Sequence, residues 1–306
     1  MAHTTSSALL ASAYNQLPDD QGTWVIKDLL PVGGSLSLYG SPKAGKSHFT
    51  LQLAHSIVGS DDDFLTFPIH RHGRVLYLQL DTPRSLWKRR TQDYEALGLD
   101  QRDLYIADRE MAPFPFEILR PDMGASWLRE QCQEIVPSVV IVDVLRNMTM
   151  ADEDKSGDMR RAFDALRSAV EPAAVILMSH AKKANLSLPA DERDNVIQDN
   201  RGSSFLPGAV DGIVKLTNKQ MICQSRTMEE RRVGLTFSPR TLWTLTNPPQ
   251  DDVMEIVDAV LADPEVPSQR AAARIIAEQT EMTEQAARRL LQRRGHGSTS
   301  HSSRPQ

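Results

Sequence analysis

One eight-residue segment, residues 40–47, restricts the possible folds of this chain more than any other stretch. It reads Gly-Ser-Pro-Lys-Ala-Gly-Lys-Ser and has the spacing G-x-x-x-x-G-K-[ST]. A short apolar run, 35–39, indicates a strand before it, and residues 48–54 continue with a helical pattern. A strand that turns through glycines into a helix directs backbone N–H groups and the positive helix end at an anion. The segment therefore predicts a phosphate-binding loop.

The side chains at the end of this loop suit a nucleoside triphosphate. Lys46 is expected to reach the β- and γ-phosphates, and the Ser47 hydroxyl is expected to ligate Mg²⁺. An accidental match in a glycine- and serine-rich turn would lack the flanking strand and helix. We therefore expect ATP and Mg²⁺ to bind here, held by Gly40, Ser41, Pro42, Lys43, Ala44, Gly45, Lys46, Ser47 and His48.

Composition limits the class of protein. The chain has 306 residues, of which 40% are hydrophobic and 25% charged, as in a soluble globular protein with one large and one small domain. Its two cysteines, Cys132 and Cys223, lack neighbours at metal-ligand spacing, which favours a reducing compartment. No run approaches about 18 apolar residues, and the N-terminus lacks a signal-peptide pattern. We expect a cytoplasmic protein without membrane contact.

Apolar runs alternate with helical patterns from residue 35 to residue 179. Continuous aliphatic strands separated by helices are typical of a parallel sheet covered on both faces. Shorter runs after Asp211 are parted by turns, as in an antiparallel meander. The predicted fold is α/β, with a mostly parallel central sheet, a meander and a small C-terminal helical domain. The expected strands are 35–39, 74–80, 104–107, 138–143, 173–179, 212–216, 221–224, 232–237 and 242–245; the expected helices in this part are 48–54, 83–97, 121–135 and 156–170.

This pattern divides the chain into four parts. Residues 1–22 are expected to form a flexible tail with one short helical turn, and residues 23–247 the ATPase domain. Residues 248–294 are expected to form the C-terminal helical domain, and residues 295–306 a polar, disordered tail.

Two carboxylates follow predicted strands at the same edge of the sheet. Asp143 ends the most apolar strand, where it can hold Mg²⁺ through water or simply cap a helix. Asp81 ends the strand after the loop helix, where it can deprotonate the attacking water or cap the helix that begins near Pro83.

Further motifs follow the loop in a fixed order. They are 76–81 (Leu-Tyr-Leu-Gln-Leu-Asp) with Leu86, Arg89 and Arg90; 140–146 (Val-Ile-Val-Asp-Val-Leu-Arg); 178–183 (Met-Ser-His-Ala-Lys-Lys); and 201–204 (Arg-Gly-Ser-Ser). This order resembles the RepA-type hexameric replicative helicases, a branch of the RecA/DnaB-like P-loop ATPases common in plasmids and phages. The resemblance covers roughly residues 24–245, and several spaced motifs are more specific than one.

The resemblance implies roles for five residues. Lys46 contacts the phosphates and Asp143 is the second metal-linked carboxylate. His180 senses the γ-phosphate, and Arg201 is an arginine finger that reaches the nucleotide of a neighbouring subunit. Asp81 matches the catalytic glutamate of the family but is one methylene shorter. A base displaced by about 1 Å can cost on the order of 10²-fold in rate.

Nucleic-acid contacts are expected at two places. In ring ATPases of this class the loops after the fourth and fifth strands face the channel; here these are about 146–157 and 182–200. The first is acidic, whereas the second carries Lys182, Lys183 and Arg193. Basic side chains at Arg226, Arg231, Arg232 and Arg240 suit an interface, DNA or a solvated face equally.

The C-terminal segment is the second place. Three short helices are expected at about 251–262, 268–278 and 283–293, and the last two open on Ser or Thr N-caps in a helix-turn-helix spacing. Residues 268–306 hold seven arginines against three glutamates, a net charge of +4 in a chain of net charge −5. Contact with DNA through Arg288, Arg289 and Arg293 and docking on another subunit both remain open.

The leading hypothesis is an ATP-hydrolysing motor on single-stranded or forked DNA, a helicase or translocase that forms a homo-oligomer, expected to be a hexamer, in DNA replication or recombination of a mobile element. One alternative is a RecA-like ATP-switched DNA-binding or recombination protein that does not unwind duplexes. Another is a regulatory ring ATPase for which DNA is incidental.

Overall fold

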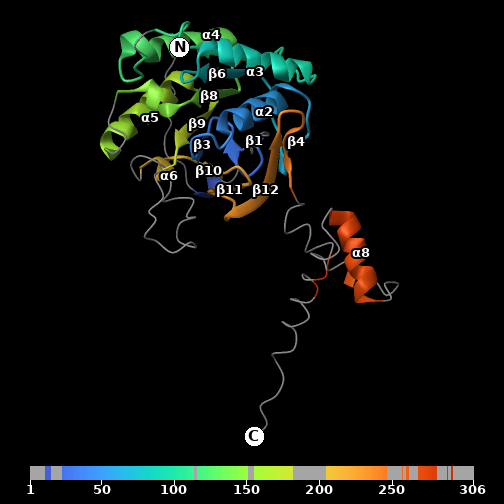
Figure 1. Ribbon diagram of the computed structural model, residues 1–306. Helices are drawn as coiled ribbons and strands as arrows, with labels where there is room; N and C mark the ends of the chain where they lie inside the picture. Colours follow the sequence, from blue (N-terminus) through green and yellow to red (C-terminus); the bar gives the residue numbers. More distant parts are fainter. Residues whose placement is uncertain are drawn as a thin grey trace, which may run out of the picture.

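The computed structural model describes residues 11–14, 23–113, 116–150, 155–181, 205–246, 257, 260, 261, 268–280, 288 and 291. Its centre is a nine-stranded sheet with helices against both faces (Figure 1). No helix within the described ranges is long and apolar enough to cross a membrane.

Six neighbouring strands of the sheet run parallel, and three more extend it as an antiparallel meander. The order across the sheet is β13-β12-β11-β10-β3-β9-β8-β6-β7. The strands are β3 (Ser35–Gly40), β6 (Val75–Gln79), β7 (Leu104–Asp108), β8 (Val139–Asp143), β9 (Ala174–His180), β10 (Gly212–Leu216), β11 (Gln220–Ser225), β12 (Arg231–Ser238) and β13 (Leu242–Leu245). All nine were expected from the sequence, and the α/β fold class with its antiparallel meander is confirmed.

Alternating side chains of the central strands pack into two separate cores. On one face Leu38, Tyr77 and Ile141 meet α2 (Lys46–Val58) and α3 (Arg84–Ala96). On the other face Leu78 and Val142 meet α4 (Ser126–Ile135) and α5 (Ser156–Val170). Strands buried on both faces need the continuous aliphatic runs seen in the sequence.

The remaining elements of this part are short. A π-helical turn η1 (Pro121–Ala125) leads into α4, so the single helix expected over 121–135 has two parts. The others are α1 (Ala11–Tyr14), the 3₁₀ turn η2 (Leu145–Met148), α6 (Phe205–Ala209), and two hairpins, β1 (Trp24–Ile26) with β2 (Leu30–Pro31) and β4 (Asp63–Phe64) with β5 (Phe67–Pro68). Neither hairpin was expected, because two- and three-residue strands leave too short a pattern to detect.

Strand β10 differs from the expectation in one respect. The sequence groups it with the antiparallel meander, but it pairs parallel to β3 over its whole length and antiparallel to β11. It is thus the sixth parallel strand, and the meander begins after it. Which strands pair with each other, and in which direction, depends on long-range packing. The local sequence pattern of one strand does not reveal it.

In the C-terminal part, one predicted helix is described in full. It is α8 (Gln269–Thr280), and the Ser268 hydroxyl accepts a hydrogen bond from the Ala271 backbone N–H at 3.2 Å, as expected of an N-cap. Ala273 and Ile276 of α8 are buried with Val257 and Leu291. The division of the chain into four parts remains a prediction.

Candidate functional site

The glycine-rich loop lies between β3 and α2, as the sequence predicts. Gly45 adopts φ 85° and ψ 14°, a left-handed conformation that favours glycine. A Cβ atom at Gly40 would lie 2.3 Å from the carbonyl oxygen of Leu216 in β10. Both glycines are therefore required by the backbone, and α2 begins at Lys46 with its N–H groups toward the loop.

Lys46 is turned into the loop and is almost fully buried. Its side chain donates hydrogen bonds to the carbonyl oxygens of Gly40 at 3.0 Å and Ser41 at 3.1 Å. Burial lowers the pKa of Lys46, while the nearby charges of Asp143 and Asp81 raise it. The lysine and both predicted carboxylates thus share one site.

Asp143 lies at the end of β8 and is 2% exposed. Burial raises the pKa of its carboxyl group, and hydrogen bonds from Ser47 and Tyr77 act in the opposite direction. The Tyr77 hydroxyl donates to Asp143 at 3.2 Å and lies 2.8 Å from the Thr50 hydroxyl. The two predicted Mg²⁺ ligands, Ser47 and Asp143, are therefore adjacent.

This pair fits a hexacoordinate Mg²⁺ ion. Mg²⁺ is usually held by one or two protein oxygens together with waters and substrate phosphates. A hydroxyl and a carboxylate beside the phosphate loop supply that donor set. Among the described residues there is no cluster of three or more His, Cys, Asp or Glu side chains suited to a metal held by protein alone.

Asp81 follows β6 and is solvent-exposed. The Leu80 N–H donates to the carbonyl oxygen of Asp143 at 2.7 Å, so the pairing of β6 with β8 continues beyond the strands and places Asp81 beside Asp143. Its Oδ1 atom accepts a hydrogen bond from Asn147 Nδ2 at 3.2 Å. The arrangement allows a water on the solvent side of the phosphate loop to meet this carboxylate.

His180 is the last residue of β9, where it pairs in register with Gly40. The Ala181 N–H donates to the Gly40 carbonyl oxygen at 3.1 Å, which ties this strand end to the start of the phosphate loop. His180 is thus next to the loop, as its predicted sensor role requires.

Several residues near this site had no assigned role in the sequence. Tyr77 and Thr50 connect β6 and α2 to Asp143, yet each looks like an ordinary member of its element. Arg90 belongs to a recognised motif, and its guanidinium lies 4.9 Å from the centroid of the Trp87 ring. Its Nη1 atom is buried without a hydrogen bond to any described residue, and its charge lowers the pKa of Asp143.

The remaining predicted residues lie outside the described ranges, are exposed, or already have partners within the chain. Arg201, Lys182, Lys183, Arg193, Arg289 and Arg293 lie outside the described residues, and Arg288 is exposed. Three arginines of the meander already have partners within the chain: Arg226 pairs with Asp211, Arg232 with Glu230, and Arg231 lies over the Phe67 ring. These contacts favour a structural surface over a DNA contact for those three.

Trp24, at the start of the domain, is half-buried in β1, and its neighbours Val25 and Ile26 belong to the core. The sequence leaves open whether this segment packs under an adenine or forms edge core. The contacts of Val25 and Ile26 place the segment in the core.

Comparison with known proteins gives a family and a fold. A family model described as an AAA domain matches residues 3–185. The crystal structure of a KaiC-like protein from the hyperthermophilic archaeon Pyrococcus horikoshii OT3 is similar, with a TM-score of 0.50 and 12% identity over 72% of this chain and 93% of that one. At that identity the likeness shows the fold alone. No curated protein matches the sequence.

These findings agree with the phosphate loop and the sheet described above. The finer resemblance to RepA-type helicases is not confirmed by them. The matched region spans more than half of the 306 residues. The chain therefore belongs to the AAA_25 family of AAA domains, and its fold is that of a RecA-like P-loop ATPase.

Proposed function

We propose that this protein hydrolyses ATP to drive movement along single-stranded or forked DNA, as a ring-forming helicase or translocase similar to the RepA type. The observation that carries the proposal is the convergence of Lys46, Asp143 and Asp81, from three parallel strand ends, in one site. The ordered motifs that resemble the RepA type add the link to DNA.

The chain's own residues divide the work of hydrolysis. Lys46 exchanges the carbonyl oxygens of Gly40 and Ser41 for the β- and γ-phosphate oxygens and neutralises their charge. Ser47 and Asp143 would hold Mg²⁺, which would supply positive charge to the phosphates of the bound nucleotide. Asp81 accepts a proton from the attacking water and is oriented by its bond to Asn147.

Two further residues connect this site to its surroundings. His180 registers the loss of the γ-phosphate and passes it to the loop that follows β9. Arg201 of a neighbouring subunit stabilises charge on the transferred phosphoryl group. An arginine supplied by another subunit makes oligomerisation a condition for turnover.

The first test is ATP turnover by Lys46→Ala, which we expect to abolish it because Lys46 is the buried lysine turned into the loop and expected to neutralise the β- and γ-phosphates. Binding of a fluorescent ATP analogue should weaken as well. Lys88→Ala provides a control, since Lys88 is an exposed lysine on α3 outside the phosphate loop. Full turnover by Lys46→Ala would contradict the assignment of the site.

The second test concerns DNA. Forked duplexes with 5′ or 3′ single-stranded tails should be separated in an ATP-dependent reaction. DNA-stimulated ATPase without strand separation on either fork would favour the RecA-like, non-unwinding alternative. ATP turnover that is insensitive to single-stranded DNA would favour a regulatory ring ATPase.

A further inference from the structure

Gln79, the last residue of β6, has a side-chain amide that is buried and unpaired. The residue is 0% exposed, and neither its Nε2 atom nor its Oε1 atom has a hydrogen-bond partner among the described residues. Buried polar groups in folded proteins nearly always have a partner, either in the protein or in something bound to it. An amide with both polar atoms unpaired therefore indicates a partner that comes from outside the chain.

The sheet places this amide beside Asp143. Gln79 is paired in register with Asp143 of β8. Side chains alternate along a strand, so Gln79 lies on the same face of the sheet as Tyr77, whose hydroxyl donates to Asp143. Adjacent strands are about 4.8 Å apart. The amide and the carboxylate are therefore neighbours on one face.

Asp108, the neighbour of Gln79 on β7, already has its own partners. It is paired in register with Gln79. Its carboxylate accepts hydrogen bonds from the Arg84 guanidinium and from the Glu110 N–H at 2.9 Å. Asp108 is thus satisfied without Gln79, and the unpaired amide is left to the side of Asp143.

Two side chains of α3 on the same face also have unpaired polar atoms. The Trp87 ring lies 4.9 Å from the Tyr77 ring, and the Arg90 guanidinium lies 4.9 Å from the Trp87 ring. Trp87 Nε1 and Arg90 Nη1 are buried without a hydrogen-bond partner in the described part of the chain. Tyr77 links this group to Asp143, so unpaired polar atoms from β6 and α3 lie close to the same carboxylate.

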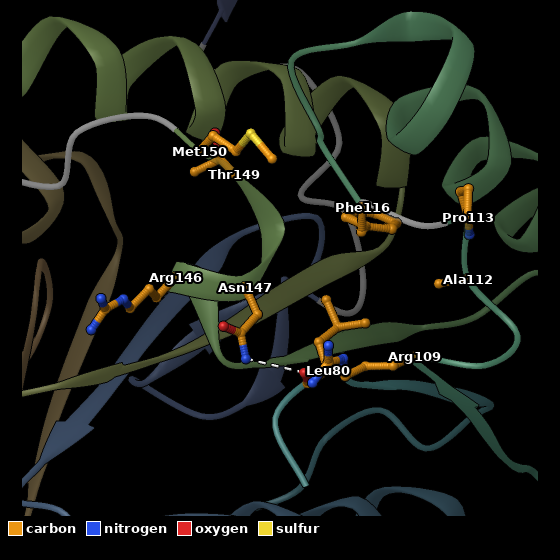
Figure 2. Close-up of a pocket in the computed structure, with 9 residues that line it drawn as sticks. All are labelled: Leu80, Arg109, Ala112, Pro113, Phe116, Arg146, Asn147, Thr149 and Met150. Carbon is orange, nitrogen blue, oxygen red and sulfur yellow. Dashed lines mark hydrogen bonds between the residues drawn. The ribbon is translucent and has the colours of Figure 1, made fainter. Parts of the chain in front are cut away.

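Asn147, another amide at the carboxyl end of the sheet, is paired within the fold. A pocket of about 290 Å³ lies there, and its lining includes Arg109, Arg146 and Asn147 (Figure 2). The Asn147 Nδ2 atom donates to the Leu80 carbonyl oxygen at 3.0 Å, as Figure 2 shows. The lack of a partner is thus particular to Gln79 and is not shared by every amide at this end of the sheet.

The chemistry of the Gln79 amide suits the water shell of Mg²⁺. This ion keeps several water ligands and is bound by only one or two protein oxygens. Water bound to a metal donates its hydrogen atoms, so the groups around it must be acceptors. Asp143 supplies carboxylate oxygens, and Gln79 Oε1 is a second kind of acceptor on the same face. Outer-shell partners of this kind orient the ligands and raise metal affinity.

We propose that Gln79 is a positioning residue for the metal, and that its Oε1 atom accepts a hydrogen bond from a water ligand of Mg²⁺ beside Asp143. The inference rests on the proposed function only in so far as ATP and Mg²⁺ bind at the phosphate loop. The amide has no partner in the protein alone and gains one when nucleotide and metal bind. Gln79 therefore lowers the stability of the nucleotide-free fold and raises the affinity for Mg²⁺.

The decisive variant is Gln79→Met, which keeps the length of the side chain and removes the amide. Binding of mant-AMPPNP, a fluorescent non-hydrolysable ATP analogue, is measured over a series of Mg²⁺ concentrations and in EDTA. The Mg²⁺ concentration at half-maximal binding should rise about tenfold, as expected for a lost outer-shell partner. Affinity in EDTA should equal that of wild type. Gln79→Leu should behave as Gln79→Met does, whereas Gln79→Glu keeps an acceptor oxygen and should retain the Mg²⁺ dependence of wild type.

Thermal unfolding without nucleotide or metal is the second measurement. Replacing an unpaired buried amide by an apolar side chain should raise the melting temperature by about 2–4 °C. Gln101→Met is the matched control, because the Gln101 amide donates to the Thr91 carbonyl oxygen at 2.8 Å. It should lower the melting temperature and leave the Mg²⁺ dependence unchanged. The same result for Gln79→Met would show that the amide has only a structural role and would overturn the inference.

Failure of the proposed function is distinguishable from failure of this inference. Wild-type protein that binds mant-AMPPNP but neither hydrolyses ATP nor acts on DNA would overturn the proposed function, and the Mg²⁺ titrations would still decide the role of Gln79. Equal Mg²⁺ dependence in wild type and Gln79→Met, together with DNA-stimulated turnover and strand separation by wild type, would overturn the inference and leave the proposed function intact.

Discussion

Lys46 and Asp143 are two buried charges of opposite sign on which the phosphate site depends. Burial lowers the pKa of the lysine and raises that of the carboxyl group, so each charged form has a desolvation cost. Each is compensated locally, Lys46 by loop carbonyl oxygens and Asp143 by Ser47 and Tyr77. The site is therefore organised by side chains that are satisfied within the fold and ready to exchange partners with a substrate.

Asp81 is the residue whose chemistry departs from the family that the motifs resemble. Asp81→Ala removes the proposed base and should reduce ATP turnover by about 10²-fold or more, since general base catalysis contributes about 10²–10⁴-fold. Asp81→Glu restores the longer side chain of the resembled family and should retain turnover. Steady-state kinetics of the two variants, with nucleotide affinity measured separately, check this prediction.

A control for Asp81 is available one strand away. Asp103 is an exposed carboxylate that pairs with Arg74 at 3.6 Å, and Asp103→Ala should leave turnover unchanged. Asp81→Ala with wild-type kcat would show that another group accepts the proton.

At the scale of elements, the hairpin β12–β13 packs against α2 and the phosphate loop. Gln52 of α2 and the backbone of Trp243 in β13 exchange two hydrogen bonds, at 3.0 Å and 2.9 Å. A Cβ atom at Gly45 would lie 2.6 Å from the Trp243 ring, so hairpin and loop are closely packed. The sequence pattern presents the meander as a separate part of the fold, but the contacts of β13 with Gln52 and Gly45 show that it packs against the phosphate loop.

His48 lies in this contact between α2, α3 and the hairpin. Its ring is 4.9 Å from that of Phe237, and its Nδ1 atom is 3.1 Å from the Tyr94 hydroxyl. Burial and the charge of Arg90 lower the pKa of His48 to about 4, against the attraction of Asp93. The folded state therefore holds this histidine neutral, whereas the unfolded chain protonates it near pH 6.5.

It follows that acid lowers the stability of the folded state between about pH 6.5 and pH 4. The unfolded state binds more protons in that window, so the free energy of unfolding falls as the pH falls. The contribution of His48 is on the order of 2–3 kcal/mol when complete. Urea unfolding at pH 7 and pH 5 without nucleotide should show this loss in wild type and a smaller loss in His48→Gln. His70→Gln, at an exposed position, is the control; an equal pH dependence in both variants would contradict the role of His48.

At the scale of the whole molecule, the strand order decides which residues meet. Strand β3 leads to Lys46, and its neighbour β9 ends at His180. The next strand, β8, ends at Asp143, and β6, on the other side of β8, leads to Asp81. Parallel strands end at the same edge of the sheet, so these residues gather although they span more than a hundred positions. This edge is also where the pocket of Arg109, Arg146 and Asn147 opens.

The proposed ring makes a prediction about mixtures of variants. If Arg201 acts on the nucleotide of a neighbour, Arg201→Ala and Lys46→Ala should each be almost inactive. Mixed rings contain sites with an intact Lys46 from one subunit and an intact Arg201 from the next, so mixing should restore part of the turnover. Specific activity should also rise with protein concentration, in parallel with mass measured by light scattering.

Two outcomes would contradict the shared site. Specific activity that stays constant down to the lowest protein concentration would indicate a self-sufficient monomer. Mixtures that remain as inactive as the separate variants, at concentrations where light scattering shows oligomers, would indicate that Arg201 acts within its own chain or not at all.

The sequence by itself determined the elements and the phosphate loop of this protein. Its G-x-x-x-x-G-K-[ST] spacing, its aliphatic runs and its strand-ending aspartates are local patterns, and local patterns predict local structure. They therefore identified all nine strands of the main sheet and the residues of Gly40 to Ser47.

Only the tertiary structure decided how these parts combine. It placed β10 parallel to β3, brought the hairpin β12–β13 under Gly45, and joined Tyr77 and Thr50 to Asp143. It also set Asn147 against Asp81 near the exposed Arg109 and Arg146. These contacts join residues far apart in the chain and depend on strand order and side-chain packing, which no spacing within a single segment records.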